Sequence, residues 1–279
     1  MNILAVFARR KIALFGLAVI GVMLVVAIFA PLIATMDPQA MNPVDKLTPP
    51  NGTYLFGTDN FGRDIFSRVV YGARASLLGS TGVILFSMTL GVLTGVVAGY
   101  FRRVEPWLMR LVDVLMAFPP LLLALVLVSI LGRGMINVIV AVGATYLTRT
   151  TRIVYGLTLK VREEAYVEAA VSSGARVRDI ILRHILPNMM SPIIVQATFT
   201  FAFSLLDMAA LDFLGLGIPP SIPSWGNMLS EGRMYITRAP WLLTFPGMCI
   251  VLTVLAFNLA GDVLRDRLDP HFRSRIEGV

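Results

Sequence analysis

The chain has 279 residues and a net charge of +7, and its composition is 56% hydrophobic but only 15% charged. Ordinary soluble domains carry about 25% charged residues, so this composition excludes that class and indicates an integral membrane protein. The positive charge does not indicate nucleic-acid binding, because the basic residues flank apolar stretches and do not form one stripe with interleaved aromatic residues.

Six stretches are long and apolar enough to cross the hydrocarbon core of a bilayer as helices, which takes about 20 residues each. They run approximately over residues 12–33, 77–100, 111–131, 135–155, 191–214 and 241–260. We therefore predict an all-α polytopic membrane protein with six transmembrane helices. The third stretch contains Pro119-Pro120, which predicts a kink or a break at that point.

The first stretch follows the basic residues Arg9, Arg10 and Lys11, as the apolar core of a secretory signal peptide would. Its apolar run is longer than the core of a signal peptide, which has about 7 to 15 residues, and residues 33–36 (IATM) offer no convincing cleavage site. We predict that the first stretch is a retained helix.

Basic residues also predict the orientation of the chain, since Arg and Lys accumulate in the cytoplasmic loops of membrane proteins. With the N-terminus inside, 17 of the 24 basic residues fall on the cytoplasmic side, among them Arg149 and Arg152. We therefore predict that both termini are cytoplasmic.

The segment 164–188, EAYVEAAVSSGARVRDIILRHILPN, lies in a loop on the predicted cytoplasmic side. Glu and Ala favour a helix over 163–173, and Gly174 can adopt the left-handed conformation that ends it. A second helix fits over 175–186, and we predict that Pro187 stops it, because proline has no N–H to donate. The segment is therefore predicted to form a short helical hairpin.

Small side chains surround the corner of this hairpin, so another protein could approach its backbone closely. Glu168 adds a charge that could meet an arginine or a helix N-terminus across an interface. The alternative is a solvated linker made of ordinary helix formers, which composition alone favours. The spacing of the residues favours the docking element.

That spacing resembles the EAA loop of ABC importer permeases. The loop contains Glu168-Ala169-Ala170, then three residues, then Gly174, and ends in Leu186-Pro187; His184 stands where the general pattern has Ile. The resemblance implies that the loop docks on a separate ATPase. The implied coupling residues are Glu168, Ala169, Ala170, Gly174, Ala175, Leu186 and Pro187.

Further motifs resemble the dipeptide, oligopeptide and nickel branch of these permeases. They are LFGTDNFGRDIFSRVVYGARASL at 55–77, RLVDVLMAFP at 110–119, LGLG at 214–217, SWG at 224–226 and NLAGDVLRDRLDP at 258–270. Because RHILPN at 183–188 is a form associated with this branch, His184 is a smaller departure there. The likeness covers nearly the whole chain.

Two groups of residues on the outer side have a functional and a structural interpretation each. Gly62, Arg63 and Asp64 form either a contact with an external binding protein or a structural turn with a local Arg–Asp pair. Asp207 and Asp212 lie in or near the outer half of the fifth stretch, where an ionisable group is costly, and could line the substrate pathway. Against this, interhelical hydrogen bonds can satisfy such acids, and the branch more usually has Glu at the first position and Ser at the second.

Other ionisable residues do not indicate catalysis or metal binding. Asp113 and Asp262 lie near cytoplasmic helix ends, where snorkelling or pairing with Arg110 or Arg265 accounts for them. The sequence has no phosphate-binding GxxxxGK[ST] loop, no HExxH and no GxSxG. His184 and His271 are far apart, and the single cysteine, Cys249, provides no disulfide framework. The sequence therefore predicts a non-catalytic protein without a cofactor or metal of its own.

Together, the residues and the resemblance predict a permease subunit of a binding-protein-dependent ABC importer with type I architecture, in a bacterial inner membrane. Residues 1–73 would form the first helix and an extracytoplasmic segment, 74–265 a five-helix core with the coupling loop at 156–190, and 266–279 a cytoplasmic tail. The implied partners are a second permease, two ATPase subunits that use ATP and Mg, and an external substrate-binding protein.

The resemblance implies di- or oligopeptides as the substrate, with a nickel chelate, glutathione, an opine or another small polar solute as alternatives. Two readings from other classes also stay open, a stand-alone secondary transporter or channel and a scaffolding or signalling membrane protein. Copurification of an ATPase would separate the importer from the transporter, and loss of uptake on deletion would exclude the scaffold.

Overall fold

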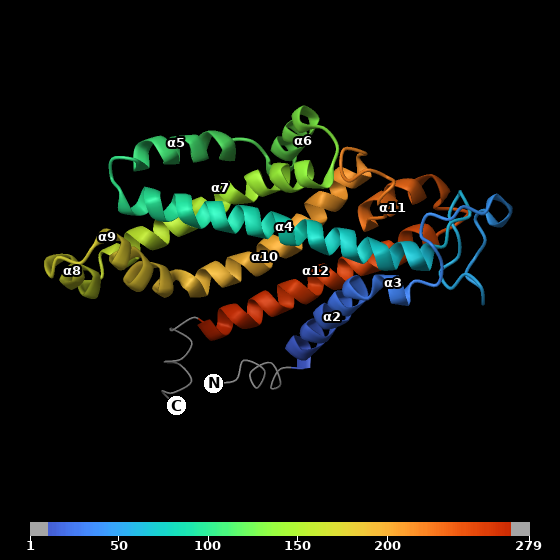
Figure 1. Ribbon diagram of the computed structural model, residues 1–279, viewed down its shortest axis with the longest axis horizontal. Helices are drawn as coiled ribbons and strands as arrows, with labels where there is room; N and C mark the ends of the chain where they lie inside the picture. The colour runs from blue at the N-terminus through green and yellow to red at the C-terminus, as the bar shows by residue number, and fades with distance from the viewer. Residues whose placement is uncertain (1–10, 269–279) are drawn as a thin grey trace.

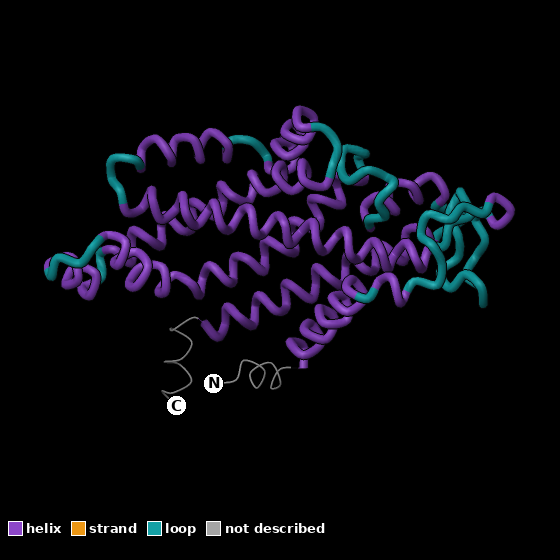
Figure 2. Tube along the Cα trace, in the orientation of Figure 1, coloured by secondary structure: helices purple, strands orange, loops and turns teal. Residues whose placement is uncertain are grey.

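The structure is a computed structural model that describes residues 11–268, and within that range its regular secondary structure is helical, with loops between the helices and one isolated β-bridge, Thr58–Asp64 (Figures 1 and 2). Arg9, Arg10, His271 and most of the predicted cytoplasmic tail lie outside the described residues. The long helices are α2 (Lys11–Ile28), α4 (Ile65–Tyr100), α7 (Met135–Arg162), α10 (Leu186–Phe213) and α12 (Trp241–Leu268). The short ones are α3 (Ala30–Ile33), α5 (Glu105–Met116), α6 (Pro120–Leu131), α8 (Ala165–Ser172), α9 (Val177–Asp179) and α11 (Trp225–Gly232). Two 3₁₀ turns cover Pro43–Asp45 and Arg233–Tyr235, and a π-helical turn covers Ile180–Ile185.

The long helices form an elongated bundle with different structures at its two ends (Figure 1). The end that carries α8 and α9 is called the hairpin end here. The opposite end carries α11 and the irregular segment 35–64, and is called the loop end.

Each of the six predicted apolar stretches is helical, but they differ in how well they fit a membrane span. Three described helices are long and apolar enough on their own, Ile65–Tyr100, Val177–Phe213 and Trp241–Asp266. The α5–α6 pair makes a fourth only if it counts as one bent span, and the apolar part of α2, Leu14–Ile28, is shorter. Helix α7 is long but carries Arg149 and Arg152 in its middle and second half.

The predicted break at Pro119-Pro120 is confirmed, and it is sharp. The axes of α5 and α6 differ by 95°. Pro119 has an extended ψ of 132°, and Pro120 opens α6 at its first position, where the missing N–H costs nothing.

The prediction that Pro187 ends a helix is wrong. Pro187 lies in the first turn of α10, and the chain continues as one helix over Val177–Phe213. A π-helical turn over Ile180–Ile185 precedes the proline, and the N–H of Leu186 donates to the carbonyl of Ile181. The side chain of Asn188 donates to the carbonyl of His184 at 2.6 Å. Local hydrogen bonds therefore compensate for the irregular backbone bonding at the π turn and the proline.

Helices α4 and α7 pack with unusually close backbones. Cβ atoms added at Gly91, Gly95 and Gly99 would lie 2.6 to 2.7 Å from the Cβ atoms of Thr150, Val154 and Thr158, respectively. The glycine every fourth residue therefore lets α7 lie directly against α4, as small residues do in membrane helix pairs.

Helix α4 begins at Ile65, well before the apolar run that was expected to start near residue 77. Its first three turns carry polar side chains such as Arg68 and Ser67, so hydropathy did not include them in the predicted membrane span. Asp64 caps the helix, since its carboxylate accepts hydrogen bonds from the N–H of Ser67 at 2.9 Å and from the Ser67 hydroxyl at 2.6 Å.

Candidate functional site

The predicted hairpin around Gly174 forms, with the first helix over Ala165–Ser172. Gly174 has a φ of +76°, its N–H donates to the carbonyl of Val171 at 3.0 Å, and the N–H of Ala175 donates to the carbonyl of Ala170 at 3.1 Å. These two bonds are the pair that defines a Schellman motif. No atom lies within 4 Å of a Cβ added at Gly174, so the corner faces open space.

Three buried side chains fasten the hairpin to the helical bundle. Val167 of α8, with Ile180 and Ile185 of the π turn, belongs to one apolar cluster. The same cluster contains Val96 of α4, Val154 of α7, and Met189 and Ile193 of α10. The hairpin therefore packs against three long helices, α4, α7 and α10.

The apolar cluster that anchors the hairpin is called its apolar root here. The predicted coupling residues lie on the outer side of this root. Glu168, Ala169, Gly174 and Pro187 are exposed, whereas Ala170, Ala175 and Leu186 are half-buried against it. Among the aromatic neighbours, the ring of Tyr166 lies 6.5 Å from that of His184. Partial burial, followed by the charge of Glu164, raises the pKa of Tyr166. The tip of the corner, Ser172-Ser173-Gly174, is exposed and has small side chains, and Glu168 is an exposed acid one turn before it.

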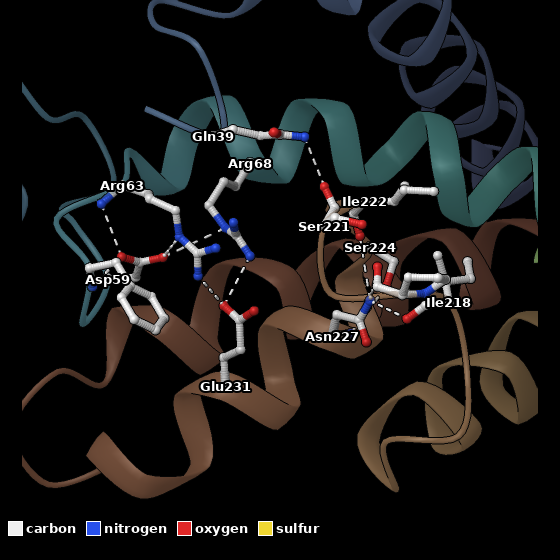
Figure 3. A network of polar contacts seen from close by, with 12 residues as sticks. Gln39, Asp59, Arg63, Arg68, Ile218, Ser221, Ile222, Ser224, Asn227 and Glu231 are labelled. Carbon is white, nitrogen blue, oxygen red and sulfur yellow. Dashed lines mark hydrogen bonds and ion pairs between the residues drawn. The ribbon is translucent and has the colours of Figure 1, made fainter. Parts of the chain in front are cut away.

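At the loop end, Arg63 takes part in a buried ion cluster that links four residues (Figure 3). The Arg63 guanidinium bonds the Asp59 carboxylate at 2.5 Å and the Glu231 carboxylate at 2.6 Å. Arg68 bonds the same oxygen of Glu231 at 2.9 Å and approaches Asp59 at 3.8 Å. The cluster joins the start of α4 to α11.

The three predicted contact residues Gly62, Arg63 and Asp64 are all buried, which favours the structural interpretation. The local Arg–Asp pair does form, although its acid is Asp59; Asp64 instead caps α4. Gly62 has a φ of +74°, and a Cβ there would lie 1.8 Å from the carbonyl oxygen of Asn42. Only glycine fits that position.

Asp212 is buried and holds the loop that follows its own helix. Its two carboxylate oxygens accept hydrogen bonds from the N–H of Ile218 at 2.7 Å and from the hydroxyl of Ser224 at 2.6 Å. Ser224 in turn caps α11 by accepting from the N–H of Asn227 at 3.1 Å. Asp212 therefore has the role of a loop clamp, and its carboxylate does not face a wide cavity.

Asp207 lies one turn and a half earlier on α10 and is only half-buried. The hydroxyl of Tyr146 on α7 donates to its carboxylate at 2.7 Å. The structure therefore separates the two predicted pathway acids, since one clamps a loop and the other joins two long helices.

Glu231 and Tyr146 had no individual signal in the sequence, and Trp225 was marked only as part of a motif. Glu231 and Trp225 belong to α11, and the indole N–H of Trp225 donates to the carbonyl of Val69 at 3.0 Å. Tyr146 also lacked a signal, because one tyrosine in an apolar helix is ordinary. The SWG motif at 224–226 was the available pointer to α11, and Trp225 is fully buried. Asp113 pairs with Arg152 of α7, not with Arg110 or Arg265 as expected.

Comparison with known proteins agrees with these features. Residues 87–274 match the family described as binding-protein-dependent transport system inner membrane component. Residues 2–50 match the N-terminal TM domain of oligopeptide transport permease C.

Curated relatives are similar over almost the full length of both chains. The dipeptide transport system permease protein DppC of Alkalihalophilus pseudofirmus is 44% identical over 95% of this chain and 88% of its own. The di/tripeptide transport system permease protein DppC of Pseudomonas aeruginosa is 42% identical over 96% and 91%. The glutathione transport system permease protein GsiD of Pectobacterium atrosepticum is 40% identical over 96% and 90%. The chain therefore belongs to the binding-protein-dependent transport inner-membrane component family, the permeases of ABC importers.

Proposed function

We propose that this chain is the permease subunit of an ATP-driven importer of di- or oligopeptides, and that its hairpin around Gly174 receives the motion of an ATPase. One observation carries the proposal. The hairpin exposes a small-sided corner while Val167, Ile180 and Ile185 fix its root among α4, α7 and α10. That arrangement suits a lever that a partner pushes.

Contacts between the long helices support six membrane crossings. Met135 at the start of α7 lies near Gly79 of α4, and Thr158 near the end of α7 contacts Gly99. The two helices therefore run parallel, so α5 and α6 together carry the chain from the hairpin end of α4 back toward the loop end. This supports counting the broken pair as one crossing, and α7 as another despite its arginines.

The same reasoning supports cytoplasmic termini. Gly16 of α2 contacts Ala256 and Leu259 in the second half of α12, and Gly261 contacts Thr198 of α10. The described chain thus begins and ends toward the hairpin end of the bundle. Basic residues accumulate there, which supports the proposal that this end faces the cytoplasm of a bacterium and the loop end faces outside.

The partners in this proposal follow from the type I architecture. A second permease would complete the pathway, and two ATPase subunits would supply ATP and Mg chemistry that this chain lacks. A substrate-binding protein would deliver the solute at the loop end, and no nucleic acid takes part. Closure of the ATPases would push the hairpin, and its apolar root would tilt α4, α7 and α10 from outward to inward access.

Peptides are the proposed substrate because the relatives named above transport dipeptides, tripeptides or glutathione by their printed names. Glutathione is the second candidate, and nickel chelates, opines and other small polar solutes follow. The binding protein would make most of the selection.

The proposal is tested by isolating the tagged chain from membranes with mild detergent and identifying its partners by mass spectrometry. The test variant combines Glu168→Ala with Gly174→Trp, and Gly174→Asn is the matched control, since Asn tolerates the left-handed conformation with a small side chain. We expect the native chain and Gly174→Asn to retain a second permease and an ATPase. The double variant should lose the ATPase and keep the permease.

Two results would contradict the proposal. If the native chain is recovered alone, it is a stand-alone transporter. If Gly174→Trp by itself supports normal peptide uptake, the hairpin is not the docking corner. Loss of the chain from the membrane with the double variant would indicate misfolding, and a Glu168→Ala single variant then provides the comparison.

A further inference from the structure

We infer that Arg149, Tyr146 and Asp207 line the pathway and that they contact the two charged termini of a zwitterionic peptide. The inference rests on the proposed function and extends it to the substrate site. Asp207 would face the amino group and Arg149 the carboxylate, with Tyr146 orienting the acid.

The three side chains gather where α7 meets α10. Tyr146 and Arg149 are three residues apart on α7, so they share one face of the helix. The Tyr146 hydroxyl donates to the Asp207 carboxylate at 2.7 Å, and Arg149 follows Tyr146 by about one turn of α7. Tyr146 is 8% exposed, Asp207 is half-buried and Arg149 is exposed.

The cluster lies within the membrane-spanning length of the bundle. Thr150 and the carbonyl of Leu147 contact Gly91 of α4, so Arg149 lies level with that glycine. Gly91 is about 14 Å along the axis from the end of α4 at Tyr100, at 1.5 Å per residue. The prediction that Arg149 belongs to the cytoplasmic loop is therefore not supported by its position.

Neither charge is neutralised inside the chain. Within residues 11–268, Arg149 forms no ion pair, whereas Arg152, one turn later, pairs with Asp113 of α5. Asp207 receives a neutral hydroxyl, not a cation. Charges at membrane depth are costly, and they face a water-filled cavity or a partner when they persist.

The chemistry of the pair matches a peptide with free ends. An arginine binds a carboxylate through two parallel N–H donors, and a carboxylate accepts from an ammonium group. Both ends of a short peptide have to cross the bilayer charged, so fixed opposite charges at depth would replace part of their lost hydration. A neutral solute would gain nothing from the two groups.

Accessibility of single cysteines in the assembled complex tests the inference. Cys249→Ser removes the one native thiol. Arg149→Cys and Asp207→Cys are then compared with Leu85→Cys, whose native side chain is 64% exposed on an apolar face of α4. Water-soluble thiol reagents of positive and of negative charge are applied to complexes that retain the ATPase and hydrolyse ATP.

We expect both test cysteines to react and Leu85→Cys to stay unmodified. The reagent preference should reverse between them: Arg149→Cys, which leaves Asp207 in place, should react faster with the cationic reagent, and Asp207→Cys faster with the anionic one. Equal unreactivity at all three positions would overturn the inference, because the arginine would then face lipid or the second permease. The same charge preference at both sites would also overturn it.

Uptake separates a substrate contact from a structural role. Asp207→Asn keeps an acceptor for Tyr146 but removes the charge, and Arg149→Gln removes the other charge. Each should lower dipeptide uptake at low concentration by about tenfold or more, as loss of a charge-assisted contact does, while ATP hydrolysis continues. Asp207→Glu and Arg149→Lys should restore part of the uptake. Unchanged uptake in both neutral variants would overturn the inference, whereas failure to recover an ATPase would count only against the proposed function.

Discussion

At the loop end, two arginines and two acids lie together with little solvent, and their balance depends on Glu231. The Arg68 side chain is 2% exposed and that of Arg63 is 8% exposed, while Glu231 is 23% exposed. One oxygen of Glu231 bonds both guanidinium groups. If Glu231 were neutral, Asp59 alone would face two buried positive charges.

Glu231→Gln should therefore destabilise the loop end. Removing one partner of a buried ion pair costs about 3 to 5 kcal/mol, because the remaining charge stays uncompensated. We expect a lower melting temperature of the purified chain in detergent and lower recovery from membranes. The measurement is thermal unfolding followed by size-exclusion chromatography.

A double-mutant cycle with Arg68→Met supplies the control. If the two residues act as a pair, Arg68→Met should recover part of the stability lost in Glu231→Gln. Additive losses in the double variant would show that Glu231 acts on Arg63 alone or through packing.

The sequence predicted part of this residue-scale chemistry. The motif GTDNFGRD at 57–64 placed an arginine beside acids, and a local Arg–Asp pair was one of the two interpretations of that segment. It could not indicate Glu231, which is 168 residues from Arg63 along the chain. Likewise, the sequence does not distinguish the roles of the two acids near the end of α10. Asp212 holds a loop, whereas Asp207 accepts a hydrogen bond from a tyrosine hydroxyl.

At the scale of elements, the α4–α7 pair depends on the absence of side chains at three positions. A Cβ at Gly95 would lie 2.7 Å from Val154 Cβ and 2.8 Å from the carbonyl oxygen of Thr151. A backbone atom cannot rotate away as a side-chain end can. Any larger residue would push the two helices apart along their length.

Gly95→Ala should therefore lower stability, with overpacking costing about 1 to 3 kcal/mol. Gly156→Ala is the matched control, since Gly156 lies on the same helix pair with no atom within 4 Å of an added Cβ. The control should be neutral or stabilising by up to about 1 kcal/mol through helix propensity. Thermal unfolding of the two variants side by side checks the prediction, and equal melting temperatures would contradict it.

Element boundaries followed from sequence where one local rule decided them. Gly174 ends α8 as glycine commonly ends helices, and Pro119-Pro120 separates α5 from α6. Pro187 misled because the same residue stops a helix in its interior and opens one in its first turn. The choice between those roles rested on the π turn at Ile180–Ile185, which has no clear sequence pattern.

For the whole molecule, the hairpin end should face the cytoplasm and the loop end the periplasm or exterior. In a Cys249→Ser background, Val44→Cys and Met234→Cys occupy loop-end positions that are 91% and 78% exposed. Both should react with a membrane-impermeant thiol reagent in intact cells. Ser173→Cys beside the hairpin corner should react only after the membrane is opened.

Reaction of Ser173→Cys in intact cells would reverse the orientation. Equal reactivity of all three positions before and after permeabilisation would show that the cells leak.

At the scale of the whole molecule, the apolar stretches and basic loops predicted the helical class well. Their summed hydropathy could not reveal that α7 brings Arg149 to the depth of Gly91, since the cost of one arginine is hidden by the apolar residues around it.

Because Val177–Phe213 is one continuous helix, a bend near the hairpin changes the position of side chains farther along it. The π turn at Ile180–Ile185 and the internal Pro192 are both near the hairpin, and both are features at which helices commonly bend. Asp207 lies about 22 Å beyond Pro192, so a rotation of about 5° at the proline would shift the acid by about 2 Å. That distance is enough to break the bond from Tyr146. A small displacement of the hairpin would thus form or break the hydrogen bond between Tyr146 and Asp207, within the membrane-spanning part of the bundle.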